Sequence, residues 1–319
     1  MIRISIIIVS WNAKAYLLNC VRSLLEDLSG IPSEIIVVDN ASTDGSAEAV
    51  EELGAGIVLL RNSQNLGFAR ANNSGIAISK GKYVCLVNSD VIVHDGCFES
   101  ITKYMDEHKS VGVLGPRTLN GDGTLQHSSF SHPNPWNTLC RALALDTLFP
   151  RSPLFGKRLM KYWTHDQTRP VDALNGCFLM VRDAAIKDVG PLDESFFIYG
   201  EDLDWCKRFG NNGWGVVFFH EAVITHFGGA SSANAPIRFF LEMNKADLQY
   251  WVKHHGKSSK LIYILLTILH QSIRIFGSLI ILVILPSRKV NQKYHVKRGL
   301  ACLKWACKEL FANEPRFSG

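Results

Sequence analysis

The stretch YVCLVNSD, from Tyr83 to Asp90, most constrains how this chain can fold. Its first five residues form an apolar run that is rich in strand formers and too short for a helix, so the run predicts a buried strand. Asn88, Ser89 and Asp90 follow at once. Ligands of open α/β sheets bind beyond the carboxyl ends of the strands, and an Asp there can hold a divalent cation that in turn holds a diphosphate. The alternative is a simple turn, because these residue types favour turns.

Strand-like and helix-like patterns alternate before this stretch. Apolar runs predict strands at 2–9, 34–38 and 57–60, and apolar spacing predicts helices at 13–28, 47–53 and within 65–79. Such alternation predicts a parallel sheet whose strands are joined by right-handed crossovers.

The end of the first strand argues against several nucleotide-binding folds. A dinucleotide-binding fold places G-x-G-x-x-G there, but this chain has VSWNAKAY, without glycine. The chain also lacks the G-x-x-x-x-G-K-[ST] loop of P-loop kinases. A nucleotidylyltransferase would need a glycine-rich basic loop at this position, and Ser10, Trp11 and Asn12 do not form one.

Composition indicates a globular protein of a reducing compartment. The 319 residues, 47% of them hydrophobic, can build one large domain or two modest ones. The eight cysteines are scattered without a C-x-x-C pair, which argues against a zinc ribbon and against a disulfide framework. The apolar run at the start is too short for a signal peptide and lacks a small-residue cleavage site.

Charge is distributed unevenly along the chain. From Ile237 to the end there are 14 Lys and Arg against 4 Asp and Glu, whereas residues 1–236 hold 20 against 25. A basic tail on a mildly acidic body indicates an anionic partner. Because the tail also carries the most apolar stretch of the chain, a membrane surface fits better than nucleic acid, and we expect no nucleic-acid partner.

Polar residues also follow the second and third predicted strands. Asp39 can accept a hydrogen bond from a base or a ribose hydroxyl, or from the backbone amides of its own turn. In NLGFARANN, Gly67 would allow close backbone approach, and Arg70 could reach a phosphate or pair with Asp39.

Four motifs, SIIIVSWN, IIVVDNASTDGS, NLGFARANN and LVNSD, resemble in order and spacing those of the family 2 glycosyltransferases. These are inverting enzymes with the GT-A fold that use nucleotide-sugar donors. The resemblance covers roughly residues 3–255 and is closest to the bacterial rhamnosyltransferase-like branch, whose members build cell-surface polysaccharides. Where many members read D-x-D, this chain reads Asn88-Ser89-Asp90, so the resemblance implies Asp90 as the surviving ligand of Mg²⁺ or Mn²⁺ and Asn88 as a neutral helper.

The resemblance also implies the remaining site residues. The residues expected to bind the donor are Ser10, Asn12, Asp39, Asn65, Gly67, Arg70, Asn88 and Asp90. Those expected beside the acceptor or the donor sugar are Asn175, Gly176, Glu201 and Trp205. Asn-Gly is also a strong hairpin dipeptide, and Trp205 fits a core position as well as a sugar contact.

The stretch FFIYGEDLDWCKR carries Glu201, Asp202 and Asp204 at an apparent helix start. A helix N-terminus favours carboxylates, but three in four positions exceed what a cap needs. Inverting transfer needs one base for the acceptor hydroxyl, and the family's base corresponds to Asp202. In some members a histidine completes the metal site, and it corresponds to His226, for which a structural role is the alternative.

The C-terminal part carries a basic patch at 244–257 and then Leu261–Leu285, a stretch long enough to span a bilayer. Polar residues fall on one stripe of this stretch, and an Arg at the bilayer centre costs about 2.5–3.5 kcal/mol. The stripe consists of Thr267, His270, Gln271, Arg274 and Ser278. We therefore expect attachment to the membrane surface through residues 259–319, with packing on the domain or on a partner subunit as the alternative.

These observations together predict an α/β fold of the GT-A type, with a mostly parallel central sheet at 1–255 and a helical, membrane-associating extension at 256–319. The expected activity is metal-dependent inverting transfer of a sugar, with dTDP-L-rhamnose as the first donor to test and UDP-sugars next. The expected acceptor is a lipid-linked or cell-surface glycan, at the cytoplasmic face of the bacterial inner membrane. A homo-oligomer and a non-catalytic nucleotide-sugar-binding module remain alternatives.

Overall fold

The computed structural model describes residues 2–54, 56–229, 235–284 and 289–312. The chain forms two compact units. Unit 1 comprises residues 1–132, 163–197 and 201–233, and unit 2 comprises residues 133–162, 198–200 and 234–319. The domain boundary predicted at 255/256 stays a prediction, and parts of the predicted extension, 285–288 and 313–319, lie outside the described residues.

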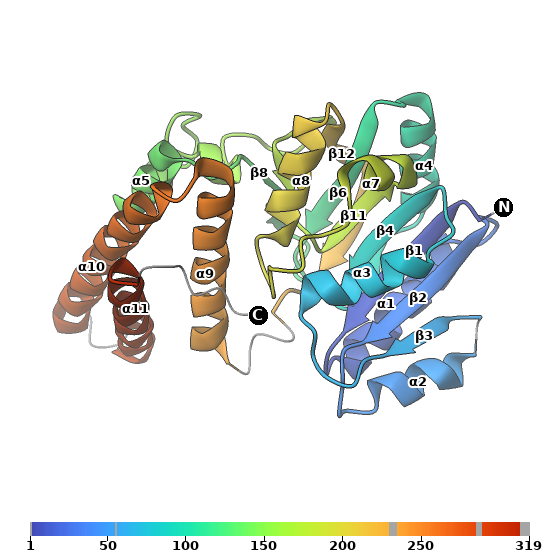
Figure 1. Cartoon of the computed structure of the whole chain (residues 1–319), viewed down its shortest axis with the longest axis horizontal. Helices are drawn as coiled ribbons and strands as arrows, with labels where there is room; N and C mark the ends of the chain where they lie inside the picture. The colour runs from blue at the N-terminus through green and yellow to red at the C-terminus, as the bar shows by residue number, and fades with distance from the viewer. Residues whose placement is uncertain (1, 55, 230–234, 285–288, 313–319) are drawn as a thin grey trace. The chain divides into compact units, whose positions relative to one another are not determined.

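Unit 1 is built on a ten-stranded sheet with the order β3-β2-β1-β4-β11-β6-β12-β5, to which β7 and β9 add at β6 and β12 (Figure 1). The strands are β1 (Ile4–Ser10), β2 (Ser33–Asp39), β3 (Val58–Arg61), β4 (Tyr83–Asn88), β5 (Val91–Val93), β6 (Val111–Leu119), β7 (Leu125–Gln126), β9 (Arg169–Pro170), β11 (Phe178–Arg182) and β12 (Gly215–His226). The helices of this unit are α1 (Lys14–Asp27), α2 (Ser46–Leu53), α3 (Phe68–Ile78), α4 (Cys97–Glu107), α7 (Asp183–Val189) and α8 (Glu201–Asn211).

Parallel pairing holds in the first half of the sheet, as the alternating pattern predicts. β1 pairs in parallel with β2 and β4, and β2 with β3. The register places Ser10 opposite Asp39 and Val9 opposite Asn88. The polar residues that follow these apolar runs therefore gather at one edge of the sheet.

The second half of the sheet is mixed. β11 runs antiparallel to both of its neighbours, β4 and β6, whereas β12 runs parallel to β6. β12 is 12 residues long and ends at His226, which pairs with Val91 of β5. This pairing brings His226 beside Asp90, the residue before β5. A separate two-stranded sheet joins β8 (Ser129–Phe130) to β10 (Ala173–Leu174).

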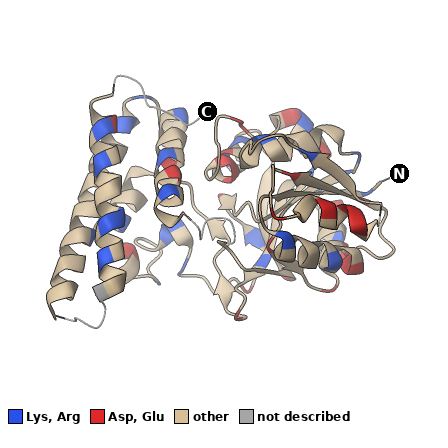
Figure 2. Cartoon of the chain, turned by 90° about the horizontal axis from the view of Figure 1, so that it is seen from below, with Lys and Arg blue, Asp and Glu red and all other residues tan. Residues whose placement is uncertain are grey.

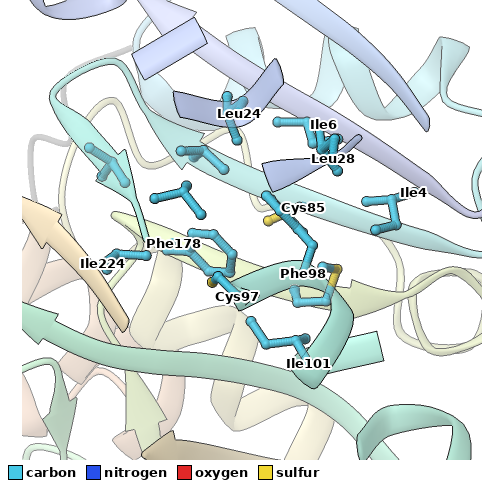
Figure 3. Packing of buried hydrophobic residues seen from close by; sticks show 14 of the residues in the cluster. Ile4, Ile6, Leu24, Leu28, Cys85, Cys97, Phe98, Ile101, Phe178 and Ile224 are labelled. Atoms are coloured by element: carbon cyan, nitrogen blue, oxygen red, sulfur yellow. The ribbon is translucent and has the colours of Figure 1, made fainter. Parts of the chain in front are cut away.

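The central strand β1 buries side chains on both faces. Ile6 and Ile8 belong to a cluster with Leu24 of α1 on one face (Figure 3). Ile7 faces the other way, where Gly75 of α3 lies so close that an added Cβ would overlap the Ile7 side chain. Because successive strand residues point to opposite faces, this run of apolar residues requires helices on both sides of the sheet.

Unit 2 is helical among its described residues. Its elements are α5 (Pro135–Ala142), α6 (Leu145–Leu148), the 3₁₀ helix η1 (Lys157–Leu159), α9 (Pro236–His255), α10 (Ser259–Ile284) and α11 (Lys289–Leu310). Pro135 occupies the first turn of α5, and Asn134 and Asn137 cap that turn reciprocally.

α10 is one continuous helix that buries several polar side chains and exposes large apolar ones, the reverse of a typical helix of a water-soluble protein. Of the predicted polar stripe, Thr267, Gln271 and Ser278 are buried within the unit. Large apolar side chains such as Phe276 and Val283 are instead 67% and 82% exposed. α10 is also the one helix among the described residues that is long and apolar enough to cross a membrane, a test that a core helix can also pass.

Replacing Gly67 with alanine is expected to destabilise the protein more than the same change at Gly54. Both glycines have positive φ, +81° and +67°, so alanine strains the backbone at both. A Cβ at Gly67 would also overlap the carbonyl oxygen of Phe197, whereas nothing lies within 4 Å at Gly54. We expect Gly54→Ala to cost about 1 kcal/mol and Gly67→Ala about 1–3 kcal/mol more. Urea denaturation measures both, and equal losses would contradict the role of this contact.

Candidate active site

Three buried side-chain oxygens at the carboxyl ends of adjacent strands have no hydrogen-bonding partner among the described residues. They are Ser10 Oγ at the end of β1, Asp39 Oδ1 at the end of β2 and Asn88 Oδ1 at the end of β4. Buried polar atoms nearly always have a hydrogen-bonding partner. Several unpaired oxygens at the carboxyl end of one sheet therefore indicate a place where a ligand supplies the partners. These residues are three of those that the sequence predicts for the donor.

Asp39 makes the predicted turn contact with one oxygen and leaves the other unpaired. Its Oδ2 accepts a hydrogen bond from the backbone amide of Ser42 at 3.1 Å, which is the turn role. Its Oδ1 stays buried and unpaired. The turn therefore fixes the carboxylate while one oxygen remains able to accept from a base or a ribose.

Two of the predicted donor-binding residues hold loops together. Asn12 Oδ1 accepts from the backbone amide of Thr43 at 2.7 Å, which ties the loop after β1 to the loop after β2. Asn65 Oδ1 accepts from Gly67 N at 2.9 Å and from Asn40 Nδ2 at 2.8 Å. For both residues, the structure gives a loop-fixing role beside the predicted donor role.

Sequence reasoning missed Asn40, which is the centre of this loop network. Its Nδ2 donates to Asn65 Oδ1, and its Oδ1 accepts from Asn62 Nδ2 at 3.1 Å and from Leu66 N at 3.0 Å. Asn40 is 3% exposed although it lies in a turn-like DNAS stretch. Its position directly after Asp39 at a strand end was the available signal.

Gly67 and Arg70 contact other parts of unit 1 than the sequence suggests. The close approach at Gly67 is to the Phe197 backbone, whose carbonyl accepts from Phe68 N at 2.7 Å. Arg70 forms an ion pair with Glu194 at 3.2 Å rather than with Asp39. Both side chains of that pair are about half exposed, so the pair leaves Arg70 accessible to an anionic ligand.

Asp90 and His226 meet, as the metal-site prediction requires. His226 Nε2 lies 3.3 Å from Asp90 Oδ1 and 3.5 Å from Asn88 Nδ2. A carboxylate, an imidazole and the unpaired amide oxygen of Asn88 form a donor set that suits Mn²⁺ or Mg²⁺. No group of three or more His, Cys, Asp or Glu with metal-binding geometry occurs in the described part of the chain, so further ligands would be Asn88, substrate oxygens or water.

The segment Asn175–Cys177 links the end of β4 to Asp202. Gly176 N donates to Asp202 Oδ2 at 2.9 Å, and Cys177 O accepts from Asn88 N at 2.9 Å. Burial, followed by the charges of Asp90 and then Asp202, raises the pKa of the Cys177 thiol. The backbone of this short segment therefore contacts Asn88 at one end and Asp202 at the other.

Asn175 and Gly176 do not turn a hairpin. β10, which precedes them, pairs with β8, whereas β11, which follows them, pairs with β4 and β6. Asn175 Oδ1 accepts from Cys177 N at 2.8 Å and so shapes the link between the two sheets. The link presents the backbone amide of Gly176 to Asp202.

The three acidic residues in the first turn of α8, Glu201, Asp202 and Asp204, have different surroundings. Asp204 is fully buried and forms an i, i+4 ion pair with Arg208 at 2.9 Å. Glu201 is buried with Oε2 unpaired, and burial first and the charge of Asp202 next raise its pKa well above the usual range. Asp202 is partly exposed, so it is the member of the predicted Glu-Asp pair that a substrate can reach.

Trp205 does not line an open surface. Its side chain is fully buried, and its indole N–H donates to Gly190 O at 2.9 Å. Of the two positions that the sequence left open, the structure therefore shows the core position. The indole anchors α8, and through it Asp202, to the segment after α7.

Comparison with known proteins decides the family. The family model described as Glycosyl transferase family 2 matches residues 5–182, more than half of the chain. The chain belongs to glycosyl transferase family 2. This glycosyltransferase carries the matched motifs on β1, β2, α3, β4 and the Asn175–Cys177 link.

Relatives of this glycosyltransferase act in glycan assembly. It is 28% identical over 236 residues to an N-acetylglucosaminyl-diphospho-decaprenol L-rhamnosyltransferase of Mycobacterium tuberculosis, covering 70% of this chain and 76% of the relative. It is also 28% identical over 211 residues to the low-salt glycan biosynthesis hexosyltransferase Agl10 of Haloferax volcanii, covering 64% and 61% of the two chains.

Solved structures confirm the predicted GT-A fold of this glycosyltransferase. The mannosyltransferase PcManGT from Pyrobaculum calidifontis, solved in complex with GDP-Man and Mn²⁺, aligns with a TM-score of 0.59 at 13% identity, over 98% of this chain and 88% of that chain. TarS of S. aureus aligns with a TM-score of 0.52 at 14% identity, over 96% and 55% of the two chains. At such identities the likeness concerns the fold.

Glu201→Gln is expected to become more stabilising as pH rises. Folded Glu201 keeps its proton, whereas the unfolded chain loses that proton above the ordinary pKa of 4.5, so this group lowers wild-type stability as pH rises beyond that value. Glutamine holds no such proton, so the stability difference should grow by at most about 1.4 kcal/mol per pH unit. Chemical denaturation at several pH values measures it, with the exposed Glu99→Gln as control. A difference that is independent of pH would contradict a buried, protonated Glu201.

Proposed function

We propose that this glycosyltransferase is an inverting, metal-dependent enzyme that moves a sugar, first L-rhamnose, from a nucleotide-diphosphate donor to a hydroxyl of a lipid-linked glycan. The observation that carries the proposal is the set of unpaired oxygens of Ser10, Asp39 and Asn88 at one sheet edge, next to Asp90. A nucleotide-sugar offers base and ribose donors for Asp39 and, with a cation, a diphosphate for the Asp90 end.

Asp90 and His226 would hold the divalent cation, with Asn88 Oδ1 as a third ligand. When bound, Mg²⁺ or Mn²⁺ would offset the charge that develops on the departing diphosphate. Asp39 is held by its turn while Oδ1 stays free, so it would orient the nucleoside end of the same donor.

Asp202 would act as the general base. It would take the proton from the acceptor hydroxyl while that oxygen bonds to the anomeric carbon of the donor sugar. The bond from this carbon to the diphosphate oxygen breaks, and the nucleoside diphosphate leaves with the bonding electrons. Attack opposite the leaving group inverts the configuration. Gly176 N fixes one carboxylate oxygen at 2.9 Å, and burial raises the pKa of the neighbouring Glu201, which disfavours a second negative charge there.

The relatives support the proposed donor and acceptor classes. The rhamnosyltransferase relative makes dTDP-L-rhamnose the first donor to test, with UDP-sugars as the alternative. The name of that relative specifies a diphospho-decaprenol carrier, so we propose a lipid-linked diphosphate glycan as the acceptor class. A screen of thermal stability with nucleotide sugars and Mn²⁺ ranks the donors.

Unit 2 would bring the enzyme to the membrane that contains such an acceptor. The outward face of α10 carries apolar side chains, of which Phe276, Val283 and Ile284 are at least two-thirds exposed. Lys and Arg line the long C-terminal helices, with few Asp or Glu beside them (Figure 2). An exposed apolar face on a unit rich in Lys and Arg fits an anionic bilayer surface, which we propose to be the cytoplasmic face of the bacterial inner membrane.

Asp202→Asn is expected to lose transfer by about 10²–10⁴-fold while keeping donor affinity, because asparagine cannot accept the hydroxyl proton. Asp90→Ala is expected to lose the part of donor affinity that depends on Mn²⁺. Calorimetric titration of the donor and product analysis measure the two properties separately, and Asp95→Asn, an exposed carboxylate, is the control. Normal turnover by Asp202→Asn would refute the base, and unchanged Mn²⁺-dependent affinity of Asp90→Ala would remove it from the metal site.

The double variant Phe276→Glu/Val283→Glu is expected to bind anionic vesicles at least about tenfold more weakly, because two apolar side chains would no longer enter the interface. Co-sedimentation with phosphatidylglycerol vesicles measures this. The matched control is Val58→Glu/Ile78→Glu, which changes exposed apolar residues of unit 1. If both double variants sediment like the wild type, the exposed face of α10 is not the attachment surface.

A further inference from the structure

Gln126, which the sequence did not single out, contacts His226 at the ring nitrogen that does not face Asp90. It ends β7, whose antiparallel pairing with β6 places it opposite Thr118. Its Oε1 lies 2.7 Å from His226 Nδ1. The other ring nitrogen of His226, Nε2, is the one that faces Asp90.

The hydrogen-bond network determines which end of the Gln126 amide is the donor. Gln126 Nε2 lies 3.1 Å from the backbone carbonyl oxygen of His226, and a carbonyl only accepts hydrogen bonds. The group facing that carbonyl must therefore be the NH₂, so the group facing the imidazole is the carbonyl oxygen. An oxygen at 2.7 Å requires His226 Nδ1 to carry the hydrogen.

Asn120 fixes Gln126 by the same logic. Its Nδ2 lies 3.4 Å from the backbone carbonyl of Leu125 and 2.9 Å from Thr124 Oγ1. Its Oδ1 is therefore the acceptor for Gln126 Nε2, at 2.8 Å. The backbone carbonyl of Leu125 thus orients the Asn120 amide, and the backbone carbonyl of His226 orients the Gln126 amide. If the Gln126 amide reversed, it would lose its hydrogen bonds to Asn120 Oδ1 and to His226 O.

We propose that Gln126 is a positioning residue that holds His226 as the tautomer protonated at Nδ1 and thereby gives the Nε2 lone pair to a divalent cation shared with Asp90. This inference rests on the proposed metal site. Metal-binding histidines commonly donate their second N–H to an oxygen acceptor, which fixes the ring and strengthens the ligand, and loss of that acceptor costs about 10–100-fold in metal affinity. Here the acceptor is a neutral amide, which adds no negative charge beside Asp90.

The wild-type protein tests the tautomer directly. A proton–nitrogen correlation spectrum of the imidazole rings, recorded without metal at alkaline pH, distinguishes the two neutral tautomers. The signal of His226 is identified by its loss in His226→Asn. We expect the hydrogen on Nδ1, and a hydrogen on Nε2 would overturn the proposal without any change at Gln126.

Gln126→Met removes the acceptor while keeping the length of the side chain. We expect Mn²⁺ affinity, measured by electron paramagnetic resonance of free Mn²⁺, to fall by about 10–100-fold. We also expect the His226 spectrum of this variant to show both tautomers. Gln167→Met, at an exposed position of the same unit, is the matched control and should leave both readouts unchanged.

Wild-type Mn²⁺ affinity and an unchanged tautomer in folded Gln126→Met would overturn the proposal. If Gln126→Met fails to fold, Asn120→Ala tests the same chain of contacts, because it removes one of the two acceptors that orient the Gln126 amide, and it should weaken Mn²⁺ binding in the same direction. These readouts do not depend on transfer. Loss of transfer in Asp202→Asn together with wild-type Mn²⁺ binding by Gln126→Met would therefore refute the role of Gln126 and leave the proposed reaction standing.

Discussion

The parallel pairing of β1 with β2 and with β4 is the constraint on which the site depends. It places the carboxyl ends of three strands side by side. Ser10 of β1 lies opposite Asp39 of β2, and Val9 of β1 lies opposite Asn88 of β4. In this register Ser10 and Asp39 follow one face of the sheet and Asn88, which pairs with Val9, follows the other, and a shift of one residue in either pairing would reverse this arrangement. The isoleucines and valines that precede them are buried on both faces, so such a shift would also disrupt the core. Packing thus fixes the positions of the orphan oxygens that a nucleotide-sugar would meet.

A second constraint joins this edge to the acidic start of α8. The backbone of Asn175–Cys177 touches Asn88 on one side and Asp202 on the other. An added Cβ at Gly176 would lie 3.4 Å from Asp202 Cβ, so the link lies close against the carboxylate. The same short segment therefore sets the distance between the residue proposed to hold the cation and the residue proposed to accept the proton. Both are fixed by backbone contacts, which are less adaptable than side-chain contacts.

The sequence predicted local features well and long-range contacts poorly. Strand ends such as Asp39 and Asn88 could be located because apolar runs stop there, and the family motifs supplied Asp90 and Asp202. The burial of Trp205 could not be predicted, because a tryptophan at a helix start fits a core and a binding surface equally well. Gln126 lies in a two-residue strand without any periodic pattern, and its contact with His226 arises only when β7 and the end of β12 meet at β6. Of the stripe predicted on α10, Thr267, Gln271 and Ser278 are buried while Arg274 is exposed, a difference that only packing decides.

The central claim is that one site holds a cation at Asp90 and a proton acceptor at Asp202 on the two sides of a single donor sugar. Crystals grown with Mn²⁺ and a dTDP-sugar, measured at a wavelength where manganese scatters anomalously, locate the ion directly. The account predicts an anomalous peak bonded to Asp90 Oδ1 and His226 Nε2 and to the donor diphosphate, with the anomeric carbon facing Asp202. A peak bonded to other residues, or a donor sugar turned away from Asp202, would contradict it.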